Sequence, residues 1–141
     1  MRAVSHTLIE FISAPIDQVF TLVSDPHQMN TWLPDCTAVE TAEPLRKGRR
    51  LTVHFGPRIT EFEIVDFAPP RTFGWIERGL RKGAKTFFQL DAAGPSTAVT
   101  IRDVWIPPSV AAWLRARVRP KRQGPRQLKQ ILENLRKLLV R

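Results

Sequence analysis

The stretch ISAPIDQVFTLVSDPHQMNTWLPD, residues 12–35, decides how the rest of the sequence is interpreted. Pro15 is suited to the first turn of a helix, and Asp17 places a negative charge at the positive helix end. Apolar residues then recur at helical spacing, which predicts a short amphipathic helix over residues 15–24. These apolar residues are Ile16, Val19, Phe20 and Val23.

The same stretch holds a second start signal, and an extended segment precedes it. Asp25 is a suitable N-cap and Pro26 a suitable first residue, so a second short helix is expected to end near Trp32. Residues 4–13 alternate in the manner of a strand. One face of that strand carries Leu8, Glu10 and Ile12, and the other carries Thr7, Ile9 and Phe11.

Six runs rich in β-branched and aromatic residues follow, which favours strands. Turn signals made of Pro and Gly separate these runs at intervals too short for intervening helices, so the strands are expected to form an antiparallel meander. The runs are CTAVETAE (36–43), RRLTVHFG (49–56), ITEFEIVDF (59–67), RTFGWIER (71–78), AKTFFQLDA (84–92) and TAVTIRDVWI (97–106).

The C-terminal segment has a helical pattern, which Pro120 and Gly124-Pro125 are expected to bend or break. A narrow apolar stripe follows the interruption, and basic residues lie outside it. The stripe is Leu128, Ile131, Leu132, Leu135, Leu138 and Leu139, and the basic residues are Arg126, Lys129, Arg136, Lys137 and Arg141. Because a curved sheet must bury its concave face, we expect one α+β domain over residues 1–141, with the sheet wrapped around this helix.

The order of these elements resembles the START/SRPBCC superfamily, and within it the polyketide cyclase/dehydrase and lipid-transport branch. The matching residues are Ala14-Pro15, Val19-Phe20, Ser24-Asp25 and Trp32 at the start and Asn134-Leu135 in the last helix. The resemblance implies a helix-grip fold with two short helices after the first of seven strands. It also implies a cavity between sheet and helix, in which members bind lipids, sterols, quinones or polyketides and some cyclise or dehydrate them.

Binding of a hydrophobic small molecule, such as a lipid, a quinone or a polyketide-like compound, is therefore the leading functional hypothesis. A polyketide cyclase or dehydratase using the same cavity is the alternative, and a protein that only contacts other proteins would have a filled core. No cofactor or metal is expected, since the three histidines are far apart and no Gly-rich phosphate loop or GxSxG motif is present.

Aromatic side chains are the candidates for the cavity walls, because hydrophobic ligands are held by apolar pockets with few polar groups. The sequence has no tyrosine, which removes one common donor for orienting a polar ligand. The competing interpretation is that these rings are ordinary core. The candidates are Phe20, Trp32, Phe55, Phe73, Trp75, Phe88, Trp105 and Trp113.

Acidic residues within apolar alternations are the candidates for chemistry. Asp103 shares a strand face with apolar neighbours, as does Glu10, and the resemblance implies that the first and last strands are adjacent. Two carboxylates in one site would raise one pKa and provide a general acid, and Arg117 on the helix above would be their counter-charge. The alternative is that these faces are solvated. Glu61 and Glu63 are interpreted as an outer face.

The net charge of +9 belongs to the C-terminal segment. Residues 1–110 carry twelve basic and twelve acidic residues, and residues 111–141 carry ten basic residues and one acid. A solvated helix face, an anionic membrane or an acidic partner protein would each explain this charge. Nucleic acid is unlikely, because no aromatic residue follows Trp113 to stack on bases. With no signal peptide in evidence and a single cysteine, Cys36, interpreted as packing, the sequence predicts a cytoplasmic protein, peripheral to a membrane if the basic face docks there.

Overall fold

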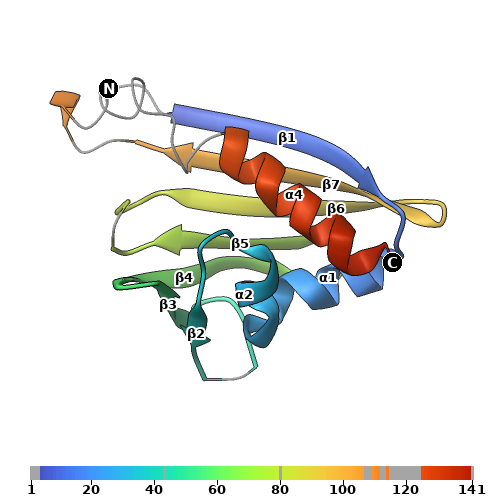
Figure 1. The fold of residues 1–141 in the computed structure, drawn as a ribbon, viewed down its shortest axis with the longest axis horizontal. Helices are drawn as coiled ribbons and strands as arrows, with labels where there is room; N and C mark the ends of the chain where they lie inside the picture. Colours follow the sequence, from blue (N-terminus) through green and yellow to red (C-terminus); the bar gives the residue numbers. More distant parts are fainter. Residues whose placement is uncertain are drawn as a thin grey trace.

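The computed structural model describes residues 4–42, 44–79, 81–106, 109–111, 114 and 125–140. Seven antiparallel strands form one sheet in the order β1-β7-β6-β5-β4-β3-β2 (Figure 1). The strands are β1 (Val4–Ile12), β2 (Ala38–Glu40), β3 (Arg50–Phe55), β4 (Arg58–Ala68), β5 (Thr72–Glu77), β6 (Lys85–Ala93) and β7 (Ser96–Trp105). The predicted α+β class and antiparallel meander are confirmed.

The helices that follow β1 begin where the sequence predicted. Helix α1 (Ile16–Ser24) starts directly after Pro15 and buries the apolar face that contains Val19 and Val23. A single 3-10 turn (η1, Pro26–Gln28) then leads into α2 (Met29–Trp32). The Asp25 side chain accepts a hydrogen bond of 2.9 Å from the backbone N–H of His27, which is the cap expected from its position.

Helix α4 (Pro125–Leu139) begins at the proline that was expected to interrupt the helical pattern. Its apolar stripe is buried at Leu128, Ile131, Leu132 and Leu135, and its described basic residues are exposed, as predicted. Figure 1 shows α4 crossing one face of the sheet beside α1 and α2. Pro120, the other expected interruption, lies outside the described residues.

Hydrogen bonds join elements that are far apart in the sequence. Strand β1 pairs along its whole length with β7, from Val4 opposite Trp105 to Ile12 opposite Thr97. The Asn134 amide of α4 donates a 2.9 Å hydrogen bond to the Trp32 carbonyl at the end of α2. The hydrogen bond joins the last helix to α2, and the same helix also packs against β1 and α1.

The two faces of the sheet differ in chemistry. On the outer face, Arg50 pairs with Glu61 at 2.9 Å and Arg78 pairs with Glu63 at 3.0 Å, so the outward assignment of both glutamates is confirmed. The inner face is aromatic. Its most parallel contact is the stack of Phe62 on Trp75, with ring centroids 5.0 Å apart and ring planes inclined by 7°.

Candidate functional site

A buried cluster of charged side chains interrupts the apolar inner face at one end of the sheet. Asp103 of β7 receives both arms of the Arg81 guanidinium, from Nη1 to Oδ2 at 3.0 Å and from Nη2 to Oδ1 at 3.1 Å. Thr86 lies directly opposite Asp103 on β6, and its hydroxyl donates a third hydrogen bond, to Oδ1, at 2.9 Å. Asp103 therefore has a complete set of donors inside the fold.

A second carboxylate approaches the same guanidinium. Glu77 is the last residue of β5, and the turn that leads to β6 folds back around its side chain. Its Oε2 accepts the backbone N–H of Arg81 at 3.0 Å, whereas its Oε1 lies 3.4 Å from Nη2 of the same residue. The first contact fixes the turn, and the second is too long to be a strong hydrogen bond.

Burial sets the electrostatics of this cluster. Burial raises the pKa of Glu77, and the charge and hydrogen bonds of Arg81 offset only part of that effect. For Arg81, burial alone would lower the pKa, but the hydrogen bonds and charges of Asp103 and, to a smaller extent, Glu77 together outweigh it and the pKa is raised. Arg81 is therefore a permanent cation, and Glu77 is the group whose protonation can change.

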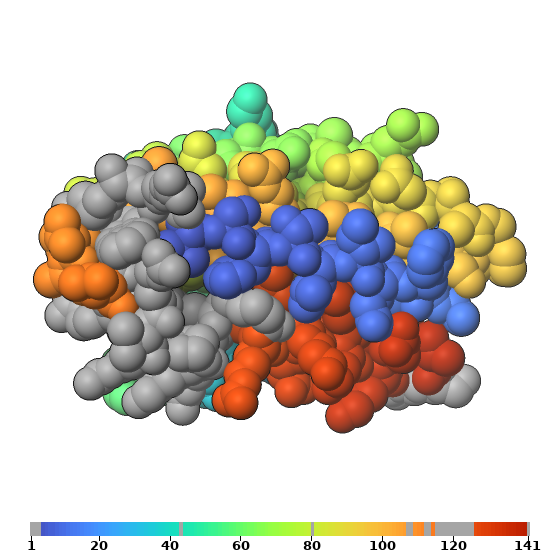
Figure 2. Space-filling view, turned by 90° about the horizontal axis from the view of Figure 1, so that it is seen from above, coloured from blue at the N-terminus to red at the C-terminus, as the bar shows by residue number. Residues whose placement is uncertain are grey.

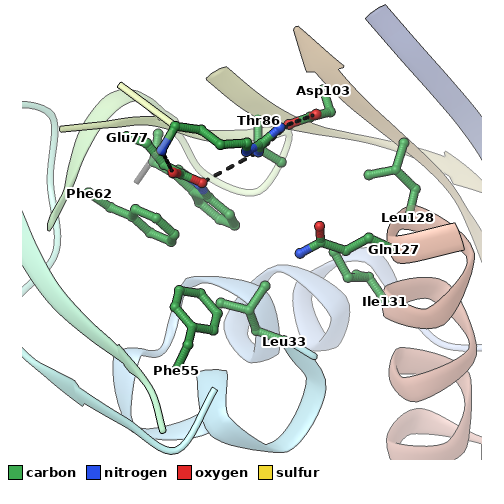
Figure 3. Close-up of a pocket in the computed structure, with 11 residues that line it drawn as sticks. Leu33, Phe55, Phe62, Glu77, Thr86, Asp103, Gln127, Leu128 and Ile131 are labelled. Carbon is green, nitrogen blue, oxygen red and sulfur yellow. Dashed lines mark hydrogen bonds and ion pairs between the residues drawn. The ribbon is translucent and has the colours of Figure 1, made fainter. Parts of the chain in front are cut away.

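A small cavity adjoins this cluster, between the sheet and α4 (Figure 3). The space open to the centre of a water molecule is about 30 Å³, which is room for about two waters. The described residues thus enclose a small cavity with charged side chains at one end. They do not enclose a cavity large enough for a lipid. The cavity is lined by Leu33, Phe55, Phe62, Trp75, Glu77, Arg81, Thr86, Asp103, Gln127, Leu128 and Ile131.

The aromatic candidates from the sequence fall into several environments. Phe55 and Trp75 line the cavity. Phe20 instead borders an open groove on another side of α1, with its ring 5.7 Å from that of Phe67. The remaining described candidates on the inner side are packed in the core, so their direct contact with a ligand is a prediction that needs the core to open. These buried residues are Trp32, Phe73 and Phe88.

Trp105 stands beside the charged cluster without lining the cavity. The Arg81 guanidinium carbon lies 5.9 Å from the centre of the Trp105 ring, within the range of a cation–π contact. Trp113 and Arg117, the two predicted contacts from the C-terminal segment, lie outside the described residues. Their role in the pocket stays a prediction.

The expected pairing of Glu10 with Asp103 is wrong. The residue opposite Asp103 on β1 is His6, and Glu10 lies opposite Val99, further along the strand. Because β1 is an edge strand, Glu10 reaches past the sheet to α4, where it forms an ion pair of 2.6 Å with Arg136. In Figure 2, β1 and α4 lie side by side at the surface where this pair forms. Glu10 therefore links β1 to α4 at the surface and does not line the cavity.

The cluster that the structure does form contains residues that sequence reasoning missed. Glu77 shares a strand face with Phe73 and Trp75, which is the same signal that identified Asp103. Arg81 belongs to the segment GLRKG (79–83), a glycine-bounded basic turn with no strand alternation to mark one of its side chains as buried. The arginine that the described residues place beside Asp103 is Arg81, from a strand connection, and the predicted counter-charge Arg117 lies outside the described residues.

Other candidate chemistry is not supported in the described residues. They contain no group of three His, Cys, Asp or Glu side chains arranged to hold a metal ion. Cys36 is buried, and burial raises the pKa of its thiol to about 11, which suits packing and not nucleophilic attack. Within the described parts of the chain, no helix is long and apolar enough to cross a membrane. Membrane docking through the basic face of α4 stays a prediction.

Comparisons with known proteins place this geometry in context. The sequence profile of the family described as polyketide cyclase / dehydrase and lipid transport matches residues 2–140. No curated protein matches the chain.

Solved structures with the same fold are numerous, and all of those compared are distant in sequence. Protein MLL2253 from Mesorhizobium loti has a TM-score of 0.71 at 18% identity, covering 98% of this chain and 96% of its own. The Aha1 dimer from Colwellia psychrerythraea has a TM-score of 0.69 at 15% identity, covering 96% of both chains. DynU16, a protein in the dynemicin biosynthetic locus, has a TM-score of 0.68 at 19% identity, covering 96% of this chain and 46% of its own. At these identities the likeness shows the shared fold.

Proposed function

The chain belongs to the polyketide cyclase/dehydrase and lipid transport family, and on that premise we propose that it binds a hydrophobic small molecule between the sheet and α4. One observation supports the proposal: a cavity whose apolar walls meet a buried hydrogen-bonding cluster at one end. Such a combination retains an apolar body and orients one polar group. A lipid, a quinone or a polyketide-like molecule would place its body against the Phe62–Trp75 stack and its polar group near Arg81 and Glu77.

Binding must open the cavity, since its present volume is far below that of such a ligand. The movable wall is the helical one, because Leu128 and Ile131 of α4 face Phe55 and Phe62 of the sheet across the gap. Side chains of α4 would swing aside or the helix would shift outward. Ligand binding is therefore expected to change the environment of α4 more than that of β6 and β7.

The test combines identification of the ligand with a mapped binding site. Native mass spectrometry of the purified protein, followed by solvent extraction, would identify any ligand carried from the cell. Titration with the uncharged apolar dye Nile red, followed by backbone amide NMR shifts, would locate binding. We expect the largest shifts at cavity residues such as Leu33, Trp75 and Ile131.

A matched pair of variants on α4 distinguishes the cavity from the surface. Gln127→Trp would fill the cavity, whereas Arg126→Trp adds the same side chain at the neighbouring exposed position. We expect Gln127→Trp to abolish dye binding and Arg126→Trp to preserve it. Equal binding by both variants, or the absence of any co-purified ligand and any dye binding, would refute the proposal.

The enzymatic alternative has one observation in its favour, the buried carboxyl of Glu77 beside the cavity. A dehydratase would use such an acid to protonate the hydroxyl of a β-hydroxy ketone, and the carboxylate so formed would take the α-proton, so that water leaves, an enone remains and the acid is regenerated. Incubation with a naphthyl β-hydroxy ketone, followed by enone absorbance, would reveal turnover that Glu77→Gln removes. Binding without any conversion would leave the carrier function.

A further inference from the structure

The charges of the buried cluster do not balance. Arg81 contributes one positive charge, while Glu77 and Asp103 contribute one negative charge each when ionised. The other described residues that line the cavity are uncharged. A net negative charge at a site shielded from water is costly, and the described residues that line the cavity supply no second cation to offset it.

The hydrogen bonds indicate which carboxyl group is in excess. Asp103 accepts three hydrogen bonds of 2.9 to 3.1 Å, and two of them form a bidentate pair with the guanidinium. Glu77 contacts the same guanidinium only at 3.4 Å, through Oε1, because both short guanidinium contacts are directed at Asp103. The proton that neutralises the cluster therefore belongs on Glu77, whose pKa burial raises.

We propose that neutral Glu77 is the group that recognises the ligand, by donating its O–H to a carbonyl oxygen, and that the site rejects carboxylates. Neutral Glu77 carries a proton that no described acceptor takes, and its side chain lines the cavity. A carbonyl would accept that proton without adding charge. With Glu77 neutral, a carboxylate would bring a second negative charge to a cluster with one cation. This inference rests on the proposed function and specifies the chemical class of its ligand.

The site should also respond to pH in one direction. The charged groups that face Glu77 are Arg81 from its own turn and Asp103 from β7, while α4 contributes the uncharged Gln127. As pH rises through the pKa of Glu77, the donor is lost and a negative charge appears beside the carbonyl. Affinity for a carbonyl ligand should fall with rising pH, and a bound carbonyl should hold the proton on Glu77.

Two compounds with one apolar body provide the test, 2-acetylnaphthalene as the ketone and 2-naphthoate as the carboxylate. Each is titrated into the full chain at several pH values and followed by backbone amide NMR shifts of cavity residues. We expect the ketone to bind at least about tenfold more tightly, because the carboxylate would bring an uncompensated negative charge into a site shielded from water. Its affinity should fall as pH rises.

Glu77→Gln is the matched variant, since glutamine keeps the shape and a donor but cannot ionise. It should bind the ketone with no pH dependence, and its thermal melt would confirm that it folds. Equal or tighter binding of 2-naphthoate in the cavity, pH-independent ketone binding by the native chain, or unchanged pH dependence in Glu77→Gln would overturn the inference. If neither compound nor the dye shifted cavity residues, the proposed function itself would fail. Dye binding in the cavity without a ketone preference would overturn only the inference.

Discussion

The same chemistry occurs on both faces of the sheet, with different consequences. On the outer face, two arginines and two glutamates form a balanced chain through Arg50, Glu61, Glu63 and Arg78. On the inner face, a single arginine, Arg81, contacts two carboxyl groups, those of Glu77 and Asp103. Glu77 and Arg78 are consecutive in sequence, yet strand alternation places them on opposite sides. At the exposed outer face, water and salt screen any imbalance between positive and negative charges. At the buried inner face the imbalance is not screened, so protonation of one of the two carboxyl groups is favoured.

Removing the inner cation should give the largest effect. Arg81→Met leaves the buried Asp103 carboxylate without a counter-charge, and breaking a buried ion pair in this way costs about 3–5 kcal/mol of unfolding free energy. Urea denaturation at neutral pH would measure the loss. A loss below about 1 kcal/mol would mean that the inner cluster behaves like a surface pair.

Removing one neutral donor should have a smaller effect. In Thr86→Val, Asp103 loses its shortest hydrogen bond while shape and volume are nearly retained. Leaving that buried acceptor short of a donor should destabilise the fold by about 1–3 kcal/mol. Thr52→Val, on the half-buried outer side of β3, is the control and should change stability much less. Equal losses in the two variants would contradict the distinction between the faces.

Glu77→Gln should change how stability depends on pH. The folded-state pKa of Glu77 is raised by burial, so its contribution to stability is present below the unfolded-state pKa and is lost as pH rises through the folded-state pKa. The variant should therefore melt close to the native chain at about pH 4 and above it at about pH 8, by a few degrees for a domain of this size. Thermal melts across this range would show the difference. A variant that is less stable at high pH would show that ionised Glu77 is needed by Arg81.

The smallest effect is expected on the outer face. Arg78→Met removes an exposed pair with Glu63, for which about 0–1 kcal/mol is typical. The loss of unfolding free energy should be smaller at about 1 M salt than at about 0.05 M salt, because salt screens exposed charges. A salt-independent loss of several kcal/mol would show that the outer chain is structural.

Most of the fold was predictable because its signals are local. The caps at Asp25 and Pro26, the strand alternation and the leucine stripe of α4 each depend on neighbouring residues. The interruption at Pro125 was also visible in the sequence, and α4 begins there. These features can be predicted without knowing which strands are neighbours in the sheet.

The site was only partly predictable because it depends on register. Asp103 was identified because it alternates with apolar residues. Its neighbour on β1 is His6 and not Glu10, because alternation shows on which face of a strand a residue lies but not which residue of the next strand lies opposite it. Glu77 carried the same alternation signal and could have been found. Arg81 could not, because the position of a turn side chain depends on how the connection folds around Glu77.

The pairing of β1 with β7 also dictates when the protein can finish folding during synthesis. Of the seven strands of this sheet, β1 is made first and can pair only after β7 has been made, and α4 covers the aromatic inner face later still. Until then the nascent chain presents an unpaired edge and exposed rings, the features that chaperones bind and that cause aggregation. A chain stalled or truncated before Pro125 should therefore be cleared by the cell's quality control and not accumulate as a partly active form.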